Sequence, residues 1–239
     1  MTQEIKKISI VIPAYNEEEL LEKELEKIIF KTNEIIDRAD YEIILVENGS
    51  SDDTLKIANK LSARYAQIRV ISLPMANYGN ALKEGILKSN GEYVTVFNVD
   101  FWDIEAMKKA LDIFLNENCD IVVCSKLMKG AQDLRPLSRK IVTRAFNLML
   151  RLLFGYHGTD THGIKIFKKE KVLPVIQKCL NNRDLFDTEL LVRSQKAGLA
   201  IKEIPIICEE KRKSVYGLFG KTPRIIKDLI LLFIYVHKR

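Results

Sequence analysis

Residues 8–18 read ISIVIPAYNEE, an apolar β-branched run that ends at Pro13 and is followed by polar residues. Residues 8–12 are predicted to form a strand, because β-branched side chains favour extended backbone and proline cannot continue a strand ladder. Asn16 is expected to cap a helix whose first carboxylates, at 17–19, lie near its positive end. A strand followed at once by a helix is the repeating unit of an α/β sheet.

The same alternation continues along the chain. Apolar, β-branched runs predict further strands, at residues 41–46, 68–73, 93–97 and 120–125. Amphipathic stretches between them predict helices, at residues 51–65, 77–89 and 104–116. The second half is expected to add two helices and two strands, at residues 139–154, 163–167, 187–197 and 199–208. The predicted fold class is α/β, with a mostly parallel central sheet and helices on both faces.

The composition indicates one sizeable core. The chain has 239 residues, and 47% of them are hydrophobic, which is enough for a single large α/β domain with a tail. Its four cysteines form no C-x-x-C pair, as expected of reduced core cysteines in the cytosol. No export signal is expected, because the first residues lead straight into a strand. The longest apolar run, at 229–236, is shorter than the roughly 20 residues that a membrane-spanning helix needs.

The formal net charge is +6, and basic residues gather at 135–151 and 211–239. Such a charge suits nucleic acid, anionic lipid or phosphorylated substrates. A nucleic-acid partner is not expected, because the sequence has no recognition motif and no aromatic residues interleaved with the basic ones. From Tyr216 onward, apolar blocks alternate with Lys and Arg, a pattern typical of helices on a lipid headgroup surface. The alternative is a terminal helix packed on the core or on a second subunit.

Polar residues follow three of the predicted strands. The first strand leads into PAYNE at 13–17, the second into ENGSSD at 47–52, and the fourth into NVD at 98–100. Ligands of open α/β sheets lie beyond the carboxyl ends of the strands, so these loops are predicted to converge on one crevice. Taken singly, each loop has the residues that ordinary turns and helix caps require.

Several segments resemble family-2 glycosyltransferases in the same order and spacing: VIPAYNEE at 11–18, VENGSSDDT at 46–54, NYGNAL at 77–82 and NVD at 98–100. Later segments resemble the dolichyl-phosphate mannose synthase branch: SRK at 138–140, DTHGIK at 160–165, FDTELL at 186–191, EIP at 203–205 and KRKS at 211–214. The resemblance implies a nucleotide-diphospho-sugar transferase (GT-A) fold. It covers about residues 8–214, so a catalytic domain is expected over residues 1–214. The apolar and basic pattern that follows predicts a basic, amphipathic, membrane-associating tail over residues 215–239.

The resemblance further implies a nucleotide-sugar site. Pro13, Tyr15 and Glu17 would frame the base, with Asn48 and Asp52 close to it. Such enzymes often have two acidic residues where this chain has Glu47 followed by an asparagine. The base of the donor, GDP or UDP, therefore stays open.

A divalent metal, Mg²⁺ or Mn²⁺, is implied by the D-x-D motif of the family, which here reads Asn98-Val99-Asp100. Hard divalent ions neutralise a diphosphate leaving group through oxygen ligands, so Asp100 and Asn98 are the candidate metal ligands. Asp103 could replace the lost carboxylate, although a helix-capping role is favoured. His162 stands where relatives often have Ser. It is expected to be either a hydrogen-bonded loop residue or a third metal ligand. Trp102 stands where the branch often has Gln.

The acceptor decides which other residues act. Attack by a hydroxyl requires a base, and Asp187 is the matching candidate. A phosphate acceptor is already anionic and needs cations instead. The resemblance places Arg139 and Arg212 at that phosphate, with Lys126 and Arg144 as further candidates.

The sequence therefore predicts a family-2 hexosyltransferase that moves a sugar, with inversion, from a GDP- or UDP-sugar to a polyprenyl (dolichyl or undecaprenyl) phosphate. The catalytic residues would be Asp100, Asp187, Arg139 and Arg212. The protein is expected to be peripheral on the cytoplasmic face of a membrane. Two alternatives remain. One is transfer to a hydroxyl of a lipid or glycan; the other is a non-catalytic nucleotide-sugar-binding or scaffold protein, which Asn98 and Trp102 motivate.

Overall fold

The computed structural model describes residues 7–36, 40–180, 183–209 and 222–237. The strands are β1 (Lys7–Ala14), β2 (Asp40–Asn48), β3 (Ile68–Leu73), β4 (Tyr93–Val96), β5 (Ile121–Ser125), β6 (Gln132–Asp133), β7 (Lys165–Lys168), β8 (Ile201–Pro205) and β9 (Ile207–Cys208). The helices are α1 (Leu21–Ile35), α2 (Thr54–Arg64), α3 (Tyr78–Lys88), α4 (Ile104–Asn116), α5 (Leu137–Phe154), α6 (Lys169–Lys178), α7 (Phe186–Lys196) and α8 (Thr222–His237).

A seven-stranded sheet in the order β3-β2-β1-β4-β7-β5-β8 forms the centre of the described structure. Neighbouring strands run parallel except at β7, which is antiparallel to both β4 and β5. The prediction of a mostly parallel sheet is thus confirmed. Ala14 lies opposite Glu47, and Val11 lies opposite Val96, so the carboxyl ends of β1, β2 and β4 reach the same edge of the sheet.

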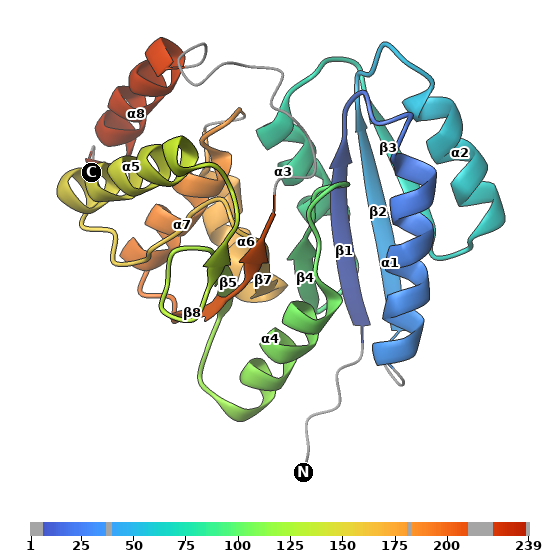
Figure 1. Ribbon diagram of the computed structural model, residues 1–239, viewed down its shortest axis with the longest axis horizontal. Helices are drawn as coiled ribbons and strands as arrows, with labels where there is room; N and C mark the ends of the chain where they lie inside the picture. The colour runs from blue at the N-terminus through green and yellow to red at the C-terminus, as the bar shows by residue number, and fades with distance from the viewer. Residues whose placement is uncertain (1–6, 37–39, 181–182, 210–221, 238–239) are drawn as a thin grey trace.

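Helices cover both faces of this sheet, as predicted (Figure 1). One apolar core lies between the sheet and α1, α2 and α4; it includes Ile10, Leu25 and Met107. The second core lies under α3, α5, α6, α7 and α8; it includes Val11 and Leu82. Alternate β1 residues therefore supply opposite cores, as the two-residue period of a strand requires. A sheet buried on both faces explains the near-continuous apolar runs of β1, β2 and β5.

The antiparallel strand β7 was predicted as an element but not as an inserted neighbour of β4. Its entry depends on Gly163, because a Cβ at that position would lie 1.8 Å from the carbonyl oxygen of Cys124. No side chain can occupy that space, so the backbone of the preceding turn passes directly against β5. This turn brings residues 160–165 beside the carboxyl end of β4.

The predicted cap at Asn16 is wrong. Helix α1 begins at Leu21, and Asn16 has a left-handed φ of 54°. Its side-chain oxygen accepts the backbone N–H of Ser51 at 2.9 Å, and its own N–H donates to the hydroxyl of Ser50 at 3.1 Å. Asn16 therefore joins the loop after β1 to the loop after β2, a long-range pairing that local sequence could not indicate.

Helix α8 packs on the second core through Leu229 and Leu232, which are buried. The ring of Phe233 meets that of Phe154 on α5, with centroids 6.0 Å apart. One side of the predicted tail thus lies against the rest of the structure. Among the described residues, α8 and the other helices are all too short or too polar to cross a membrane.

Candidate active site

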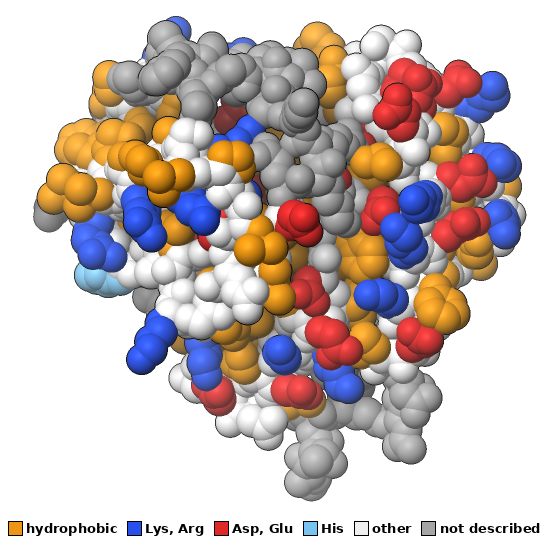
Figure 2. All heavy atoms as spheres, in the orientation of Figure 1, with side chains coloured by type: hydrophobic (Ala, Val, Ile, Leu, Met, Phe, Trp, Pro, Cys, Tyr) orange, Lys and Arg blue, Asp and Glu red, His pale blue; other side chains and the backbone are white. Residues whose placement is uncertain are grey.

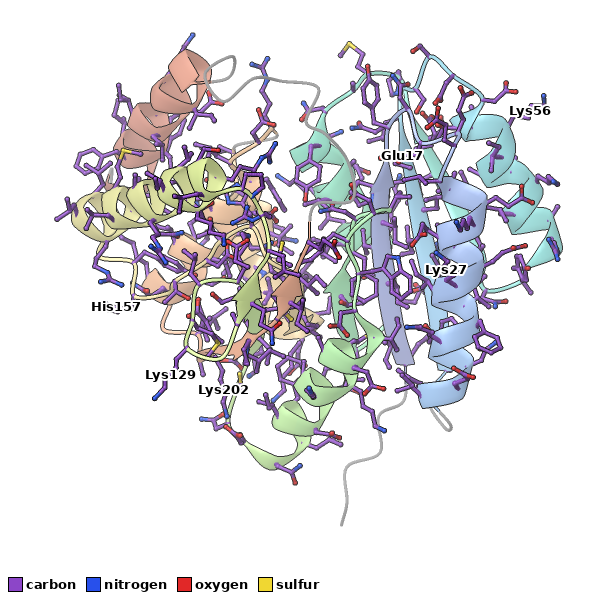
Figure 3. All side chains as sticks on the ribbon, in the orientation of Figure 1. Glu17, Lys27, Lys56, Lys129, His157 and Lys202 are labelled. Atoms are coloured by element: carbon purple, nitrogen blue, oxygen red, sulfur yellow. The ribbon has the colours of Figure 1, made fainter. Side chains whose placement is uncertain are left out.

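A cleft of about 560 Å³ opens at the carboxyl ends of β1, β2 and β4. Its lining residues are Pro13, Ala14, Tyr15, Glu17, Asn48, Ala76, Asn77, Tyr78, Asn98, Val99, Asp100, Arg183 and Asp184. Glu17 lies above the end of β1, at the top of the sheet in the view of Figure 3. The three polar loops therefore converge on one crevice, because the register of the parallel strands brings their ends to the same edge.

Most of the residues predicted to hold the donor line this cleft. Pro13 is buried at the end of β1, whereas Tyr15 is 46% exposed and also lines the cleft. Asn48 is buried, and its side-chain oxygen accepts the backbone N–H of Asn77 at 2.8 Å. This bond ties the end of β2 to the start of α3. The arrangement provides an aromatic ring and polar groups of the kind that hold a nucleoside.

Asp52 lies outside the lining of the cleft. Its carboxylate accepts the backbone N–H groups of Glu18 at 3.2 Å and Thr54 at 3.0 Å. Burial alone would raise the pKa of Asp52, but the hydrogen bonds from Thr54 and Glu18 outweigh it and lower that pKa. Asp52 thus joins the loop after β1 to the loop after β2, next to the residues that were predicted to bind the nucleotide sugar.

Asn98 and Asp100 both line the cleft. The backbone of Asn98 pairs with that of Phe101 in both directions, at 3.0 and 3.2 Å, and so closes a tight turn after β4. Asp103 accepts the backbone N–H of Ala106 at 2.9 Å at the start of α4, which is the capping role favoured from sequence. Trp102 donates its indole N–H to Glu24 at 2.9 Å, beside α1.

The donor set at this turn suits a substrate-bridged divalent ion. Across the described ranges, His, Cys, Asp and Glu nowhere gather in threes that could hold a metal by themselves. Mg²⁺ usually takes one or two carboxylates from the protein and completes its shell with substrate phosphates and water. Asp100 and the carbonyl oxygen of Asn98 are hard oxygen donors at the mouth of a polar cleft, so the residues present fit such an ion.

His162 borders a small cavity beside the cleft together with Asn98 and Lys165. Its Nδ1 lies 3.0 Å from the hydroxyl of Thr161, and its ring meets that of Phe146 edge-on, with centroids 5.6 Å apart. These contacts are those of a hydrogen-bonded loop residue. If His162 were a third metal ligand, its Nε2 would bind the ion, because its Nδ1 already lies within hydrogen-bond distance of Thr161.

Asp187 is buried, with 2% of its surface exposed, and is not among the lining residues of the cleft. Its Oδ1 lies 3.1 Å from the Nζ of Lys165, and its Oδ2 accepts from the hydroxyl of Tyr78 at 3.3 Å. The Tyr78 hydroxyl also lies 3.5 Å from the side-chain oxygen of Asn98. Burial, reinforced by the charge of Asp187, raises the pKa of Tyr78, which stays a neutral donor. Asp187 is therefore held on one oxygen by the hydrogen bond from Tyr78 and on the other by its ion pair with Lys165, although that second oxygen, Oδ1, accepts no hydrogen bond from the described residues.

Glu189 points elsewhere, although it lies on the same helix. Its carboxylate pairs with Arg193 at 2.7 Å and accepts the backbone N–H of Leu180 at 3.1 Å. The two carboxylates diverge because residues two apart lie on different sides of a helix.

The described residues that were predicted to contact the acceptor phosphate are not among those that line the cleft. Arg139 lies half-buried in the first turn of α5, and Arg144 is exposed farther along that helix. Lys126 is buried and ion-paired with Asp160 at 2.7 Å. Arg212 lies outside the described residues.

Sequence reasoning missed three residues of this region. Arg183 and Asp184 reach the cleft wall from the segment before α7, and no motif or strand end marked them. Lys165 carried a usable signal, since it stands between Ile164 and Ile166 in a segment predicted as a strand, yet its partner in the ion pair is distant in sequence.

Comparison with known proteins gives consistent matches. The family described as Glycosyl transferase family 2 matches residues 9–173. Glycosyltransferase AglD of Haloferax volcanii is 28% identical over 207 residues, 85% of this chain, but the chain spans only 33% of that protein. Dolichyl-phosphate beta-glucosyltransferase ALG5A of Trichomonas vaginalis is 27% identical over 238 residues, covering 95% of this chain and 73% of the relative. The Dictyostelium discoideum dolichyl-phosphate beta-glucosyltransferase is also 27% identical, with 93% and 72% covered.

Two solved structures show the same fold. Glucosyl-3-phosphoglycerate synthase from Mycobacterium tuberculosis, in complex with Mn²⁺, UDP and glucosyl-3-phosphoglycerate, superposes with a TM-score of 0.67 at 20% identity, over 95% of this chain and 80% of that one. TarS residues 1–349 of S. aureus superpose with a TM-score of 0.60 at 16% identity, over 95% and 65% of the two chains. At this level of identity the likeness concerns the fold, and it confirms the predicted GT-A architecture.

Proposed function

Because the chain belongs to glycosyl transferase family 2, we propose that it transfers a hexose from a nucleotide-sugar donor to a polyprenyl phosphate. Two relatives that span most of this chain are named dolichyl-phosphate beta-glucosyltransferases, which supports a polyprenyl phosphate acceptor. The sugar and the base, GDP or UDP, are left open.

The state of Asp187 is the observation that carries the choice of acceptor. A hydroxyl acceptor would have to give up its proton to a carboxylate within hydrogen-bond reach. Asp187, the matching candidate, is 2% exposed and engaged by Lys165 and Tyr78, so an incoming hydroxyl cannot reach it without breaking an ion pair. A phosphate oxygen is already anionic and needs no base. Asp187 is therefore proposed to support the site rather than to remove a proton.

The donor is proposed to lie in the cleft with its base near Tyr15 and Glu17 and its diphosphate near the turn after β4. Mg²⁺ or Mn²⁺ held by Asp100 and Asn98 would neutralise the charge of the departing nucleoside diphosphate. The protein's own residues orient the donor so that the acceptor phosphate attacks the anomeric carbon from the side opposite the leaving group. That single displacement inverts the configuration there.

The acceptor's hydrocarbon chain would reside in a membrane, so we further propose a peripheral location on the cytoplasmic face. Helix α8 supports this through exposed apolar side chains at Ile230, Phe233 and Ile234 and an exposed Lys227. Such a helix suits a position in the headgroup region rather than across the bilayer.

Arg139→Ala is expected to raise the KM for polyprenyl phosphate about tenfold or more while leaving the donor KM nearly unchanged. The loss of a charge-assisted hydrogen bond costs about 1.5 to 3 kcal/mol, and 1.4 kcal/mol corresponds to tenfold. Steady-state kinetics with each substrate varied in turn would measure the difference. Arg64→Ala, on the surface of α2, is the matched control. Equal increases in both KM values would remove the proposed acceptor role; Arg212→Ala tests the other candidate in the same assay.

A further inference from the structure

Helix α5 is apolar on two sides. Its inner side packs on the second core through Leu150 and Phe154. Its outer side carries a stripe of four aliphatic residues whose exposures are 69%, 57%, 57% and 77%: Leu137, Ile141, Leu148 and Leu152. Residues spaced by four, seven and four positions lie on one face of a helix. A contiguous exposed apolar stripe of this kind marks a surface that contacts another molecule or a membrane.

Helix α8 lies beside α5 and has exposed apolar side chains of its own. Figure 1 shows α5 and α8 next to each other, and the contact between Phe154 and Phe233 joins them. Beyond its buried side, α8 exposes a further set of large apolar side chains: Ile230, Leu231, Phe233, Ile234 and Tyr235. Figure 2 shows hydrophobic side chains gathered over α5 with basic ones beside them. We call the outer stripe of α5 and these α8 side chains the α5–α8 surface.

The charges next to the α5–α8 surface are almost all positive. Helix α5 contains no Asp or Glu. Lys140, Arg144 and Arg151, four and seven positions apart, form a row beside its apolar stripe. Helix α8 adds the exposed Lys227, against one carboxylate at Asp228. An anionic lipid bilayer has negatively charged headgroups over a hydrocarbon interior. An apolar stripe with cations along its edge complements both layers.

We propose that the α5–α8 surface docks on anionic membranes, with the α5 stripe immersed at the boundary between headgroups and acyl chains. The inference rests on the proposed function, because it gives the lipid acceptor a route to the site. Arg139 lies in the first turn of the same helix. A docked α5 would hold this guanidinium near the headgroup level, where a lipid-linked phosphate lies.

The test uses the full-length chain and co-sedimentation with vesicles of phosphatidylglycerol and phosphatidylcholine. Leu148→Ser/Leu152→Ser is expected to lower the partition coefficient about tenfold or more, because two buried leucine side chains are lost from the bilayer. Phe30→Ser is the matched control: it is 64% exposed on α1, on the opposite flank, and should leave binding unchanged. Arg151→Glu should weaken binding to the anionic vesicles more than to pure phosphatidylcholine.

Unchanged vesicle binding of the double serine variant would overturn the proposal. So would a parent protein that stays in solution but forms dimers that the variant dissociates, since the surface would then join two copies. Loss of binding together with retained transfer to a short-chain, water-soluble polyprenyl phosphate would support it and show an intact catalytic site. If the surface binds vesicles but the protein transfers sugar to no polyprenyl phosphate, the docking stands and the proposed function fails.

Discussion

Asp100→Ala is expected to abolish the metal-dependent part of donor binding and to lower kcat/KM about a hundredfold or more. Asp100 is the carboxylate of the turn after β4 that lines the cleft, and the ion it would hold is worth several kcal/mol to the leaving group. Calorimetric titration of GDP- and UDP-sugars, with and without Mn²⁺, measures the effect on binding directly. Removal of the metal with a chelator should reduce donor binding by the parent protein to the level of the variant.

Asn98→Asp provides the opposite change at the same turn. A second carboxylate restores the charge that a hard divalent ion prefers, so metal-dependent donor binding should tighten. Asp112→Ala, on α4 and away from the cleft, is the control for general charge loss. Donor binding that is unchanged both in Asp100→Ala and after chelation would show that this turn holds no ion.

Lys165→Met is expected to destabilise the protein by about 3 to 5 kcal/mol, because it leaves the carboxylate of Asp187 buried without its cation. The two side chains are 2% and 3% exposed, with their charged atoms 3.1 Å apart. The double variant Lys165→Met/Asp187→Leu should recover most of the loss, since replacing a whole buried pair by apolar side chains is often nearly neutral. Urea denaturation of the parent, the two single variants and the double variant gives the coupling energy.

Additive losses in that cycle would contradict the pairing. A stable double variant also separates support from catalysis. If Asp187 only holds the site together, the double variant should keep measurable transfer to a phosphate acceptor. If Asp187 instead removes a proton during transfer, the double variant should have no such activity.

The fold was largely predictable because its main signal is local. Apolar runs such as those of β1, β2 and β4 are buried on both faces, and turn residues punctuate them, so their order already indicates a mostly parallel sheet. Site residues at strand ends followed from the same signal. Pro13, Tyr15, Asn48 and Asp100 all lie in the cleft, because parallel register alone brings their loops together.

What the sequence could not show depends on contacts between distant segments. The insertion of β7 between β4 and β5 is set by pairing after a long excursion of the chain. Asn16 reads locally as a cap, yet it bonds to the loop after β2. Asp187 reads as a candidate base, and only the approach of Lys165 and Tyr78 reveals that its carboxylate is held in an ion pair and a hydrogen bond. In each case the partner lies far away in sequence, where no periodicity reports it.

The most direct test of the account is a comparison of two acceptors that differ in one group. Purified full-length protein, with Mn²⁺ or Mg²⁺ and a labelled nucleotide sugar, is offered a polyprenyl phosphate or the polyprenol of the same chain length. The predicted result is labelled lipid only with the phosphate, since Asp187, the base that a hydroxyl acceptor would be expected to use, is buried and ion-paired with Lys165. Equal or preferential transfer to the polyprenol would contradict it.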